Sequence, residues 1–434
     1  MGSITPSSSF NVLRDTKPED ASLPAFMVST TRGFLPRQEP IIKLPSEFDV
    51  LESILSRMPI KTLDGSPGLL ANFTLGETVL KELPNLTSSI DKYKDNLPLM
   101  NALYRDYSFL ASAYLLEPCH ERFVKGEAYG LGRQTLPAVI SLPISRCAEL
   151  AGFKPFMEYA GSYALFNYRL QDPTKGLEYD NLRLIRAFEH GLDSKSSEAG
   201  FVLVHVDMVR NSGPLVDGVV SALDACENRD REAFNVGMEK VVTSMTKVNK
   251  VMDVYEGVSE EPLSFRGESG ANDSMVPLCD NLLDITMPKT PLTSILQDFR
   301  QYRPGNHREF LEYVKTRSSH LSLKSYALQD PSSAALYLLA LNQVRDFRWR
   351  HWCFTREYIL KKTSHPTATG GSPIVTWLPN QLQAVMQAMV DVWETHDKAL
   401  GKGCEEVMDL LYVQKETLQK EVEKYCKERH VEAN

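Results

Sequence analysis

The 434-residue sequence has no apolar run close to the roughly 20 residues that a membrane-spanning helix requires. Its first residues, Met1 to Pro6, lack the basic start and apolar core of a secretory signal. Seven cysteines are scattered along the chain and none is spaced C-x-x-C, which argues against a zinc ribbon or a disulfide framework. We therefore expect a cytoplasmic protein that does not enter a membrane.

The sequence also has no surplus of positive charge. Lys and Arg number 48 against 56 Asp and Glu, for a formal net charge of -8. A dedicated nucleic-acid-binding protein normally carries a basic surplus or a basic stripe, so we expect no nucleic-acid partner. Hydrophobic residues make up 42% of the chain, which is enough for a substantial core.

The signatures of several large enzyme classes are missing. There is no H-E-x-x-H motif, no G-x-S-x-G elbow and no Walker loop, which removes the usual evidence for a zinc protease, a serine hydrolase or a nucleotide hydrolase. The glycines between Gly126 and Gly132 do not have dinucleotide-loop spacing, and no Lys-Ser/Thr pair follows them. We interpret that segment as a turn.

Helical spacing of apolar residues dominates what is present. It is clear in residues 47–55, 99–116, 331–361 and 382–432, and Pro331 after Asp330 marks a helix start. This pattern divides the chain into four parts. They are an N-terminal arm (1–43), a small helical domain with its linker (44–132), a large domain (133–397) and a charged helical C-terminal extension (398–434).

Two of the nine histidines lie in apolar surroundings. His205 is inside the β-branched run Phe201–Val206, which by local preference predicts a buried strand. His351 lies on the inner stripe of the longest predicted helix, between Trp349 and Trp352. Each has two readings: a core histidine bonded to a carbonyl, or an axial ligand that projects into an apolar space and holds a haem iron.

Several blocks, taken in order, resemble the indoleamine 2,3-dioxygenase family. The most informative is Arg348-Trp349-Arg350-His351, followed seven residues after the histidine by Tyr358-Ile359-Leu360. Each other block is weak alone, but they share the family order. They are Arg32–Pro36, Tyr255–Gly257, Phe265–Ala271, Cys279–Leu283, Tyr302–Leu311 and Ala368–Gly371.

The resemblance implies an all-α fold, with a small N-terminal helical domain and a large helical domain that encloses one haem b. It implies that His351 is the proximal iron ligand, with Arg348 and Asp280 as a pair that orients it. It also implies a helix on the distal side at Phe201–Val206, against the local strand preference.

The distal pocket implied by the resemblance contains one unusual residue. His205 stands where animal members carry a small hydroxyl residue, and it is expected to hydrogen-bond the indole N–H or the dioxygen. The remaining implied residues contact the substrate or the haem edge. They are Phe201, Ser162, Tyr163, Thr369 and Gly370 for the substrate, and Ser269 for the haem. The strip Tyr159–Tyr168 carries one residue more than the family pattern.

A second departure concerns the substrate carboxylate. The family has an aromatic residue and an Arg before Tyr-Glu-Gly, whereas Thr246–Val254 contains neither. Lys247, Lys250 and Arg266 are candidate replacements, but a Lys is not a bidentate clamp. Without a replacement, recognition of free tryptophan would weaken by a few kcal/mol.

The function implied is a haem-dependent dioxygenase that opens the indole 2,3-bond of L-tryptophan, giving N-formylkynurenine, or of a related indole. Its partners would be the indole, dioxygen and an external electron donor. Two alternatives remain open: a divergent haem oxygenase acting on an elaborated indole in fungal secondary metabolism, and a haem-binding protein without turnover.

Overall fold

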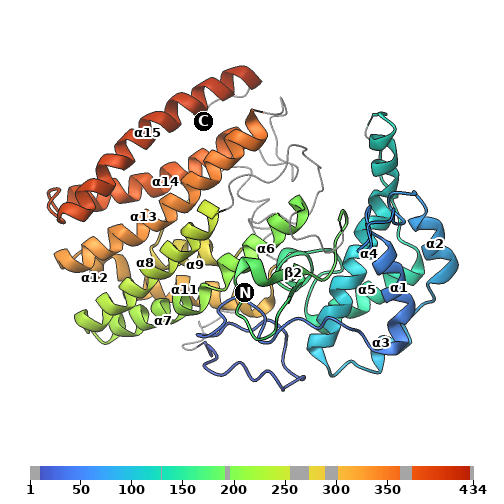
Figure 1. The fold of residues 1–434 in the computed structure, drawn as a ribbon. Coiled ribbons are helices and arrows are strands. Elements are labelled where there is room, and N and C mark those ends of the chain that lie inside the picture. The colour runs from blue at the N-terminus through green and yellow to red at the C-terminus, as the bar shows by residue number, and fades with distance from the viewer. Residues whose placement is uncertain are drawn as a thin grey trace, which may run out of the picture.

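The computed structural model describes residues 10–128, 130–190, 196–254, 273–288, 302–361 and 374–430. Within these ranges the chain is helical apart from one small sheet, as the sequence predicts (Figure 1). Figure 1 shows α1–α5 at one end, α7–α15 at the other, and α6 with the sheet between them. Within the same ranges, no helix is long and apolar enough to cross a membrane.

The first group of helices is organised around α4. Its start is specified locally, because the Asn96 side chain accepts a hydrogen bond from Leu99 N at 3.1 Å and Pro98 occupies the first turn. Most residues of α4 are buried, so this helix forms the centre of the group. The helices are α1 (Asp49–Arg57), α2 (Leu75–Glu82), α3 (Thr87–Asp91), α4 (Leu97–Val124) and α5 (Ala138–Ala151), after the short 3₁₀ turn η1 (Ser46–Phe48).

The middle of the chain contains a π-helix, η2 (Tyr159–Tyr163), and an antiparallel pair of strands. Strands β1 (Tyr168–Leu170) and β2 (Leu182–Leu184) pair with Leu170 opposite Leu182, and η3 (Tyr179–Asn181) leads into the second.

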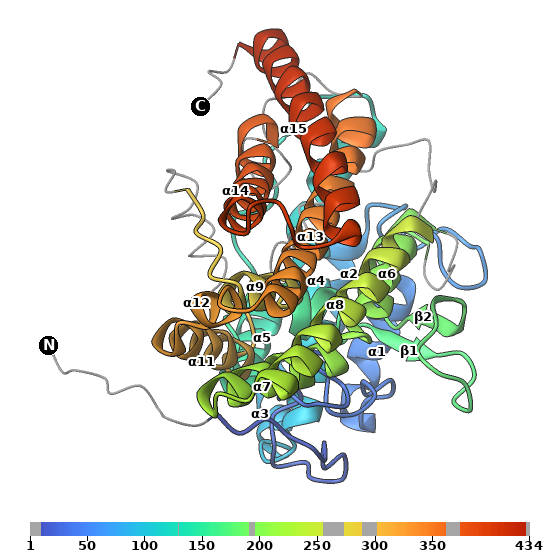
Figure 2. The same cartoon turned by 90° about the vertical axis from the view of Figure 1, so that its left-hand side faces the viewer.

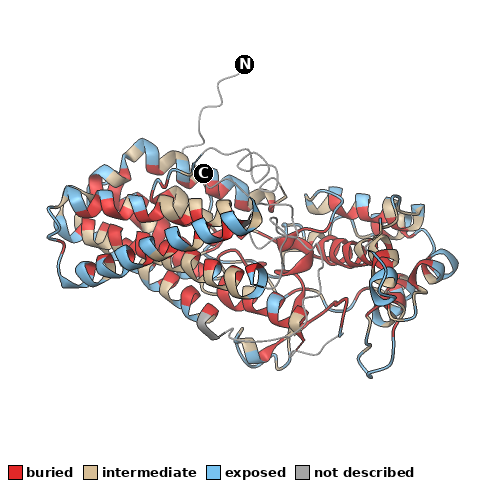
Figure 3. Cartoon of the chain, turned by 90° about the horizontal axis from the view of Figure 1, so that it is seen from above, coloured by how far each residue is buried: buried red, intermediate tan, exposed pale blue. Residues whose placement is uncertain are grey.

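The second group is larger. Its helices pack around α8 and α13, which contact each other extensively. Figure 3 shows buried residues along the inward faces of these helices and exposed residues along their outer faces. They are α6 (Ser197–Val209), α7 (Ser212–Glu227), α8 (Arg231–Val254), α9 (Met275–Leu282), α11 (Gly305–Leu321), α12 (Leu323–Ala327), α13 (Pro331–Phe354), α14 (Ile374–Thr395) and α15 (Lys402–Arg429), with the π-helix η5 (Thr355–Leu360) directly after α13.

The strand expected from local preference at Phe201–Val206 is wrong. This segment lies in the middle of α6, as the family resemblance implies. Ser196 caps the helix by accepting a hydrogen bond from Ala199 N at 3.2 Å. Burial of Val202, Leu203 and Val206 against neighbouring elements outweighs the weak intrinsic preference of β-branched residues for strands.

The N-terminal arm contacts the second group at Phe10, which packs on Phe310 of α11, and around Gly33. Gly33 lies at φ +58°, and a Cβ there would come within 2.0 Å of the Ser212 hydroxyl at the start of α7. The Phe34 N–H donates to the same hydroxyl at 2.9 Å. Glycine is therefore required at this point, both for the backbone conformation and for the close approach.

A buried ion network joins the first group of helices to the segment that follows β2. Asp106 on α4 accepts hydrogen bonds from Arg105 Nε at 2.8 Å and from Arg186 Nε at 2.9 Å. Arg186 follows β2 and also pairs with Glu52 of α1 at 2.8 Å. All the charges in this network have partners, which is the condition under which burial of ions is tolerated.

Candidate functional site

His351 lies near the end of α13, and its environment is unusual for a helix residue. By surface area the side chain is exposed, yet removal from water, together with the charges of His205 and Arg348, lowers its pKa to about 4. The two facts agree if the ring faces an internal space that admits a small molecule and is surrounded by protein. A neutral imidazole with a free lone pair is the form that binds a metal.

After removal from water, His205 on α6 is the next largest cause of the lowered pKa of His351, so the two side chains are within electrostatic range of each other. His205 Nδ1 lies 2.6 Å from the carbonyl oxygen of Phe201. Because a carbonyl can only accept, Nδ1 carries the proton and Nε2 keeps its lone pair. Burial lowers the pKa of His205, so the neutral tautomer persists at neutral pH.

Aromatic rings surround His205. Its ring centroid is 4.7 Å from that of Phe201 and 5.5 Å from that of Tyr159, which meets it edge to face. Tyr163 lies 6.3 Å from Phe201. Phe201 itself is 39% exposed, so part of its ring is accessible to a ligand. Flat apolar walls with one polar acceptor suit a planar aromatic ligand that carries an N–H.

Tyr159 is a site residue that the sequence analysis did not select. Its hydroxyl is buried and has no hydrogen-bond partner among the residues that the structure describes. Burial, with the nearby negative charges of Asp273 and Glu158, raises its pKa well above the ordinary value, so the hydroxyl stays protonated. In the sequence, Tyr159 could have been selected because it begins the aromatic strip. That its hydroxyl is buried without a partner can be seen only in the three-dimensional structure.

Ser162 is placed differently from Tyr163. Its hydroxyl donates to Glu158 O at 2.7 Å and accepts from Glu158 N at 2.8 Å, so both interactions are made within its own turn. That turn is η2, in which Tyr163 N bonds Glu158 O and Ala164 N bonds Tyr159 O, both at 2.9 Å. These hydrogen bonds span five residues, which defines a π-helix.

The pair expected beside the proximal ligand is formed. Arg348 Nη2 lies 2.7 Å from Asp280 Oδ2, with the two side chains 9% and 13% exposed. Asp280 lies on α9, and its neighbour Asn281 donates to Leu311 O of α11 at 2.8 Å. The pair therefore connects the turn before His351 to two other helices.

The segment before Tyr255 forms the continuous end of α8. Lys247 and Lys250 are exposed on its outer face, while the neighbouring Asn249 is buried and donates to the Gln343 carbonyl of α13 at 3.1 Å. In the described residues of this segment, the inward positions carry no cation. Four predicted residues lie outside the described residues: Ser269, Thr369, Gly370 and the candidate clamp Arg266.

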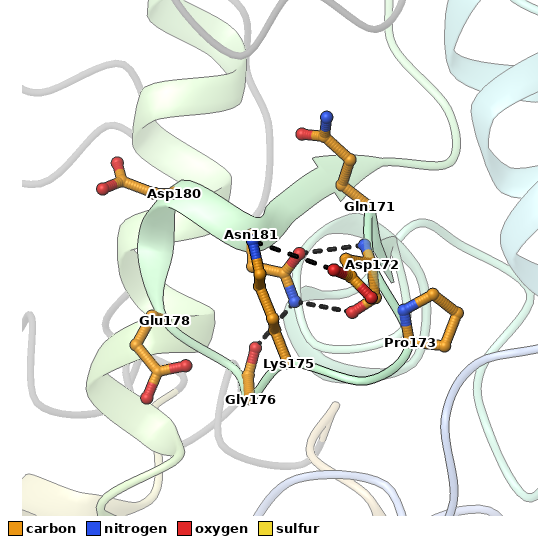
Figure 4. Close-up of a pocket in the computed structure, with 8 residues that line it drawn as sticks. All are labelled: Gln171, Asp172, Pro173, Lys175, Gly176, Glu178, Asp180 and Asn181. Carbon is orange, nitrogen blue, oxygen red and sulfur yellow. Dashed lines mark hydrogen bonds and ion pairs between the residues drawn. The ribbon is translucent and has the colours of Figure 1, made fainter.

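A separate surface pocket of about 740 Å³ lies at the β1–β2 turn. Figure 4 shows that the Asn181 side chain is engaged within the pocket wall, since it donates to Asp172 O and Gly176 O. Neither His205 nor His351 lines it, so we assign it no part in the site. In the portion of the chain that the structure describes, no three His, Cys, Asp or Glu side chains form a metal cluster.

Comparison with known proteins agrees with the family resemblance of the motifs. The family model described as indoleamine 2,3-dioxygenase matches residues 22–254 and 253–420. The chain is 25% identical over 400 residues to indoleamine 2,3-dioxygenase nanC of Aspergillus nanangensis, covering 82% of this chain and 91% of that protein. It is 23% identical over 360 residues to human indoleamine 2,3-dioxygenase 2, covering 72% and 82%. The match to mouse indoleamine 2,3-dioxygenase 1 is 24% identical over 218 residues, covering 42% of this chain and about half (52%) of that protein.

Proposed function

The chain belongs to the indoleamine 2,3-dioxygenase family, and on that premise we propose that it uses haem b to open the 2,3-bond of an indole, with L-tryptophan as the first candidate substrate. The observation that carries this proposal is the placement of His351 and His205. Removal from water lowers the pKa of both imidazoles, so both are neutral near pH 7, and the pKa of His351 responds to His205. The rings of Tyr159 and Phe201 lie beside His205.

The residues present fit a haem. His351 offers a neutral imidazole into an internal space, and Arg348 with Asp280 stabilises the turn that carries it. Ser269 is proposed to contact the haem edge. When bound, haem supplies the iron that activates dioxygen for insertion across the indole C2–C3 bond. The protein contributes binding, orientation and exclusion of water.

His205 has a defined role in this proposal. Its Nδ1–H is already donated to Phe201 O, so Nε2 can accept a hydrogen bond but cannot donate one. The indole N–H is a donor of the required kind. His205 therefore orients the indole ring through its N–H, and of the two roles considered from the sequence this geometry favours the indole over the dioxygen.

The aromatic residues complete the pocket. Phe201 presents its exposed ring to the space, with Tyr163 behind it. Tyr159 brings a protonated hydroxyl without a partner beside His205. Stacking on these faces would orient the indole and displace water from the reacting bond. Ser162 shapes the turn that presents both tyrosines, and Thr369 and Gly370 are proposed to hold the substrate amine.

A second candidate substrate is supported by α8. As far as the structure describes the last turns of α8, up to Met252, their buried positions carry no cation for a carboxylate, and Lys247 and Lys250 are exposed. An elaborated indole whose carboxylate is masked would suit such a pocket. The third candidate is a haem-binding protein without turnover. An activity assay distinguishes it from the two enzymes.

The test begins with purified protein supplied with hemin. A Soret band is expected, and it should be lost in His351→Gly and regained when imidazole is added to that variant. The reduced protein is then given dioxygen, an electron donor and L-tryptophan, and N-formylkynurenine is followed by absorbance. Turnover supports tryptophan; turnover only with carboxylate-masked indoles supports the second candidate; a Soret band without any turnover supports the third. A wild-type protein without a Soret band refutes all three.

A further inference from the structure

The C-terminal helix α15 packs alongside α13 and η5 in a parallel register. Arg345 pairs with Gln414, the Trp352 Nε1–H donates to Glu421 Oε2 at 2.7 Å, and Arg429 Nη2 donates to Leu360 O at 2.6 Å. All three pairs are separated by the same 69 residues. Figure 1 shows α13, α14 and α15 side by side, and in Figure 2 α15 lies above α13 and α14.

Burial confirms that this contact is part of the core. The inward residues of α15 recur at helical spacing, which excludes a free, solvated helix. They are Cys404, Met408, Leu411, Gln414, Leu418, Val422, Tyr425 and Cys426. A helix that buries a whole stripe and makes polar contacts in a single register has one defined position on its neighbour.

Glu421 is the central polar contact. One carboxylate oxygen accepts from Trp352 Nε1 at 2.7 Å, and the other accepts from Arg356 Nη1 at 2.6 Å. The Glu421 and Arg356 side chains are only 20% and 23% exposed, so their pairing is partly shielded from solvent. The Trp352 ring is fully buried and also meets Tyr425 edge to face, with centroids 6.4 Å apart.

These contacts are made immediately beside the proposed iron ligand. Trp352 is the residue after His351, and successive residues of an α-helix point about 100° apart. One face of the helix end therefore presents His351 to the internal space, while the neighbouring face is held by Glu421. Arg356 and Leu360, on the π-helix that follows, are held by the same helix. Rotation or shift of the α13 end would move both faces together.

We infer that α15 fixes the position of the α13 end that carries His351, the proposed proximal ligand. Glu421 is the positioning residue, which sets the orientation of His351 through its contacts with Trp352 and Arg356. This inference rests on the proposed haem site. A hydrogen bond of a Trp N–H to a carboxylate is charge-assisted and directional, so its loss allows the ring and the adjoining backbone to rotate. The consequence is a weaker and more variable bond between His351 and the iron.

The experiment uses the full chain with hemin bound and compares wild type with Trp352→Phe, Glu421→Gln and Glu421→Ala. Trp352→Phe keeps an aromatic ring and removes the donor, whereas Glu421→Gln keeps an acceptor and removes the charge. Glu406→Ala is the matched control, since Glu406 is an exposed glutamate on the same helix, 70% accessible. The measurements are the rate of hemin transfer to excess apomyoglobin, the iron–histidine stretching band in resonance Raman spectra, and the ferric/ferrous midpoint potential.

We expect Glu421→Ala and Trp352→Phe to raise the hemin-transfer rate by about tenfold, the effect of one lost charge-assisted hydrogen bond. The iron–histidine band should shift or broaden in both variants. Glu421→Gln should give a hemin-transfer rate and a band between those of the two variants and wild type. Glu406→Ala should match wild type in both measurements.

Wild-type values of band and transfer rate in Trp352→Phe overturn the inference, even if its melting temperature falls. If Glu421→Ala does not fold, Trp352→Phe and Glu421→Gln decide the question. A wild-type protein without a Soret band refutes the haem site instead, which keeps the two failures distinct.

Discussion

The His205 ring donates its Nδ1–H to the carbonyl oxygen of Phe201, four residues earlier on α6, at 2.6 Å. This internal hydrogen bond uses the only proton of the neutral ring and leaves Nε2 as an acceptor. It also orients the imidazole relative to the Phe201 ring, whose centroid is 4.7 Å away. One turn of α6 therefore fixes His205 and Phe201 relative to each other in the proposed indole subsite.

His205→Ala should reduce kcat/KM for an indole substrate by roughly 10- to 100-fold, because the indole N–H loses its acceptor in a water-poor site. The matched comparison is the N1-methylated form of the same substrate, which has no N–H to donate. Its turnover by wild type and by His205→Ala should be similar. An equal loss with both substrates would show that His205 acts on something other than the indole nitrogen.

Tyr159→Phe should stabilise the ligand-free protein by about 1 kcal/mol, because it removes a buried hydroxyl that has no partner. The same change should weaken substrate binding if that hydroxyl pairs with the ligand. Tyr107→Phe is the control, since Tyr107 on α4 also has a buried hydroxyl without a partner, and burial beside Cys147 and Asp106 raises its pKa.

Urea unfolding and substrate titration together test this pair of variants. Both should be at least as stable as wild type, but only Tyr159→Phe should bind substrate more weakly. Unchanged binding in Tyr159→Phe would remove its hydroxyl from the substrate site.

Asp280→Asn should destabilise the protein by about 3 kcal/mol, because it leaves the buried Arg348 guanidinium without its counter-charge. The double variant Asp280→Asn/Arg348→Gln removes both charges and should recover much of that loss in urea unfolding. Its hemin affinity should stay below wild type, since the oriented pair is still missing. Full recovery of hemin affinity in the double variant would count against an orienting role.

Glu198 predicts a dependence of stability on pH. Burial raises the pKa of Glu198 to about 7 from an ordinary value of 4.5, although the N–H groups of Glu189 and Phe188 donate to its carboxylate. The folded state thus retains a proton that the unfolded state loses, so its contribution is complete below pH 4.5 and falls as the pH rises through 7. The change is on the order of 3 kcal/mol.

Glu198→Gln should flatten this contribution, because an amide does not titrate in this range. The comparison is the free energy of urea unfolding at pH 5 and pH 7.5 for both proteins. Equal slopes with pH in wild type and variant would contradict the raised pKa.

The order of motifs along the chain was enough to predict an all-α family fold and the Arg348–Asp280 pair, which the structure contains. The role of His351 as iron ligand stays a prediction. Helix starts were readable because caps act locally, as at Asp330 and Pro331, where Ser333 N donates to the Asp330 carboxylate at 2.9 Å. The local reading failed at Phe201–Val206, since β-branched residues form a helix when tertiary burial requires it.

Only the tertiary structure decided which hydrogen bonds the site residues make. Which atoms meet in space decides three features of the site. They are the tautomer of His205, the buried Tyr159 hydroxyl without a partner among the described residues, and the hydrogen bond of Ser162 to Glu158 within its own turn. The same holds for Glu421, which lies 69 residues after Trp352 in the sequence and 2.7 Å from it in the fold. Residue types and spacing record what a chain can form locally, whereas hydrogen-bond partners across helices follow from packing, which single-sequence patterns do not encode.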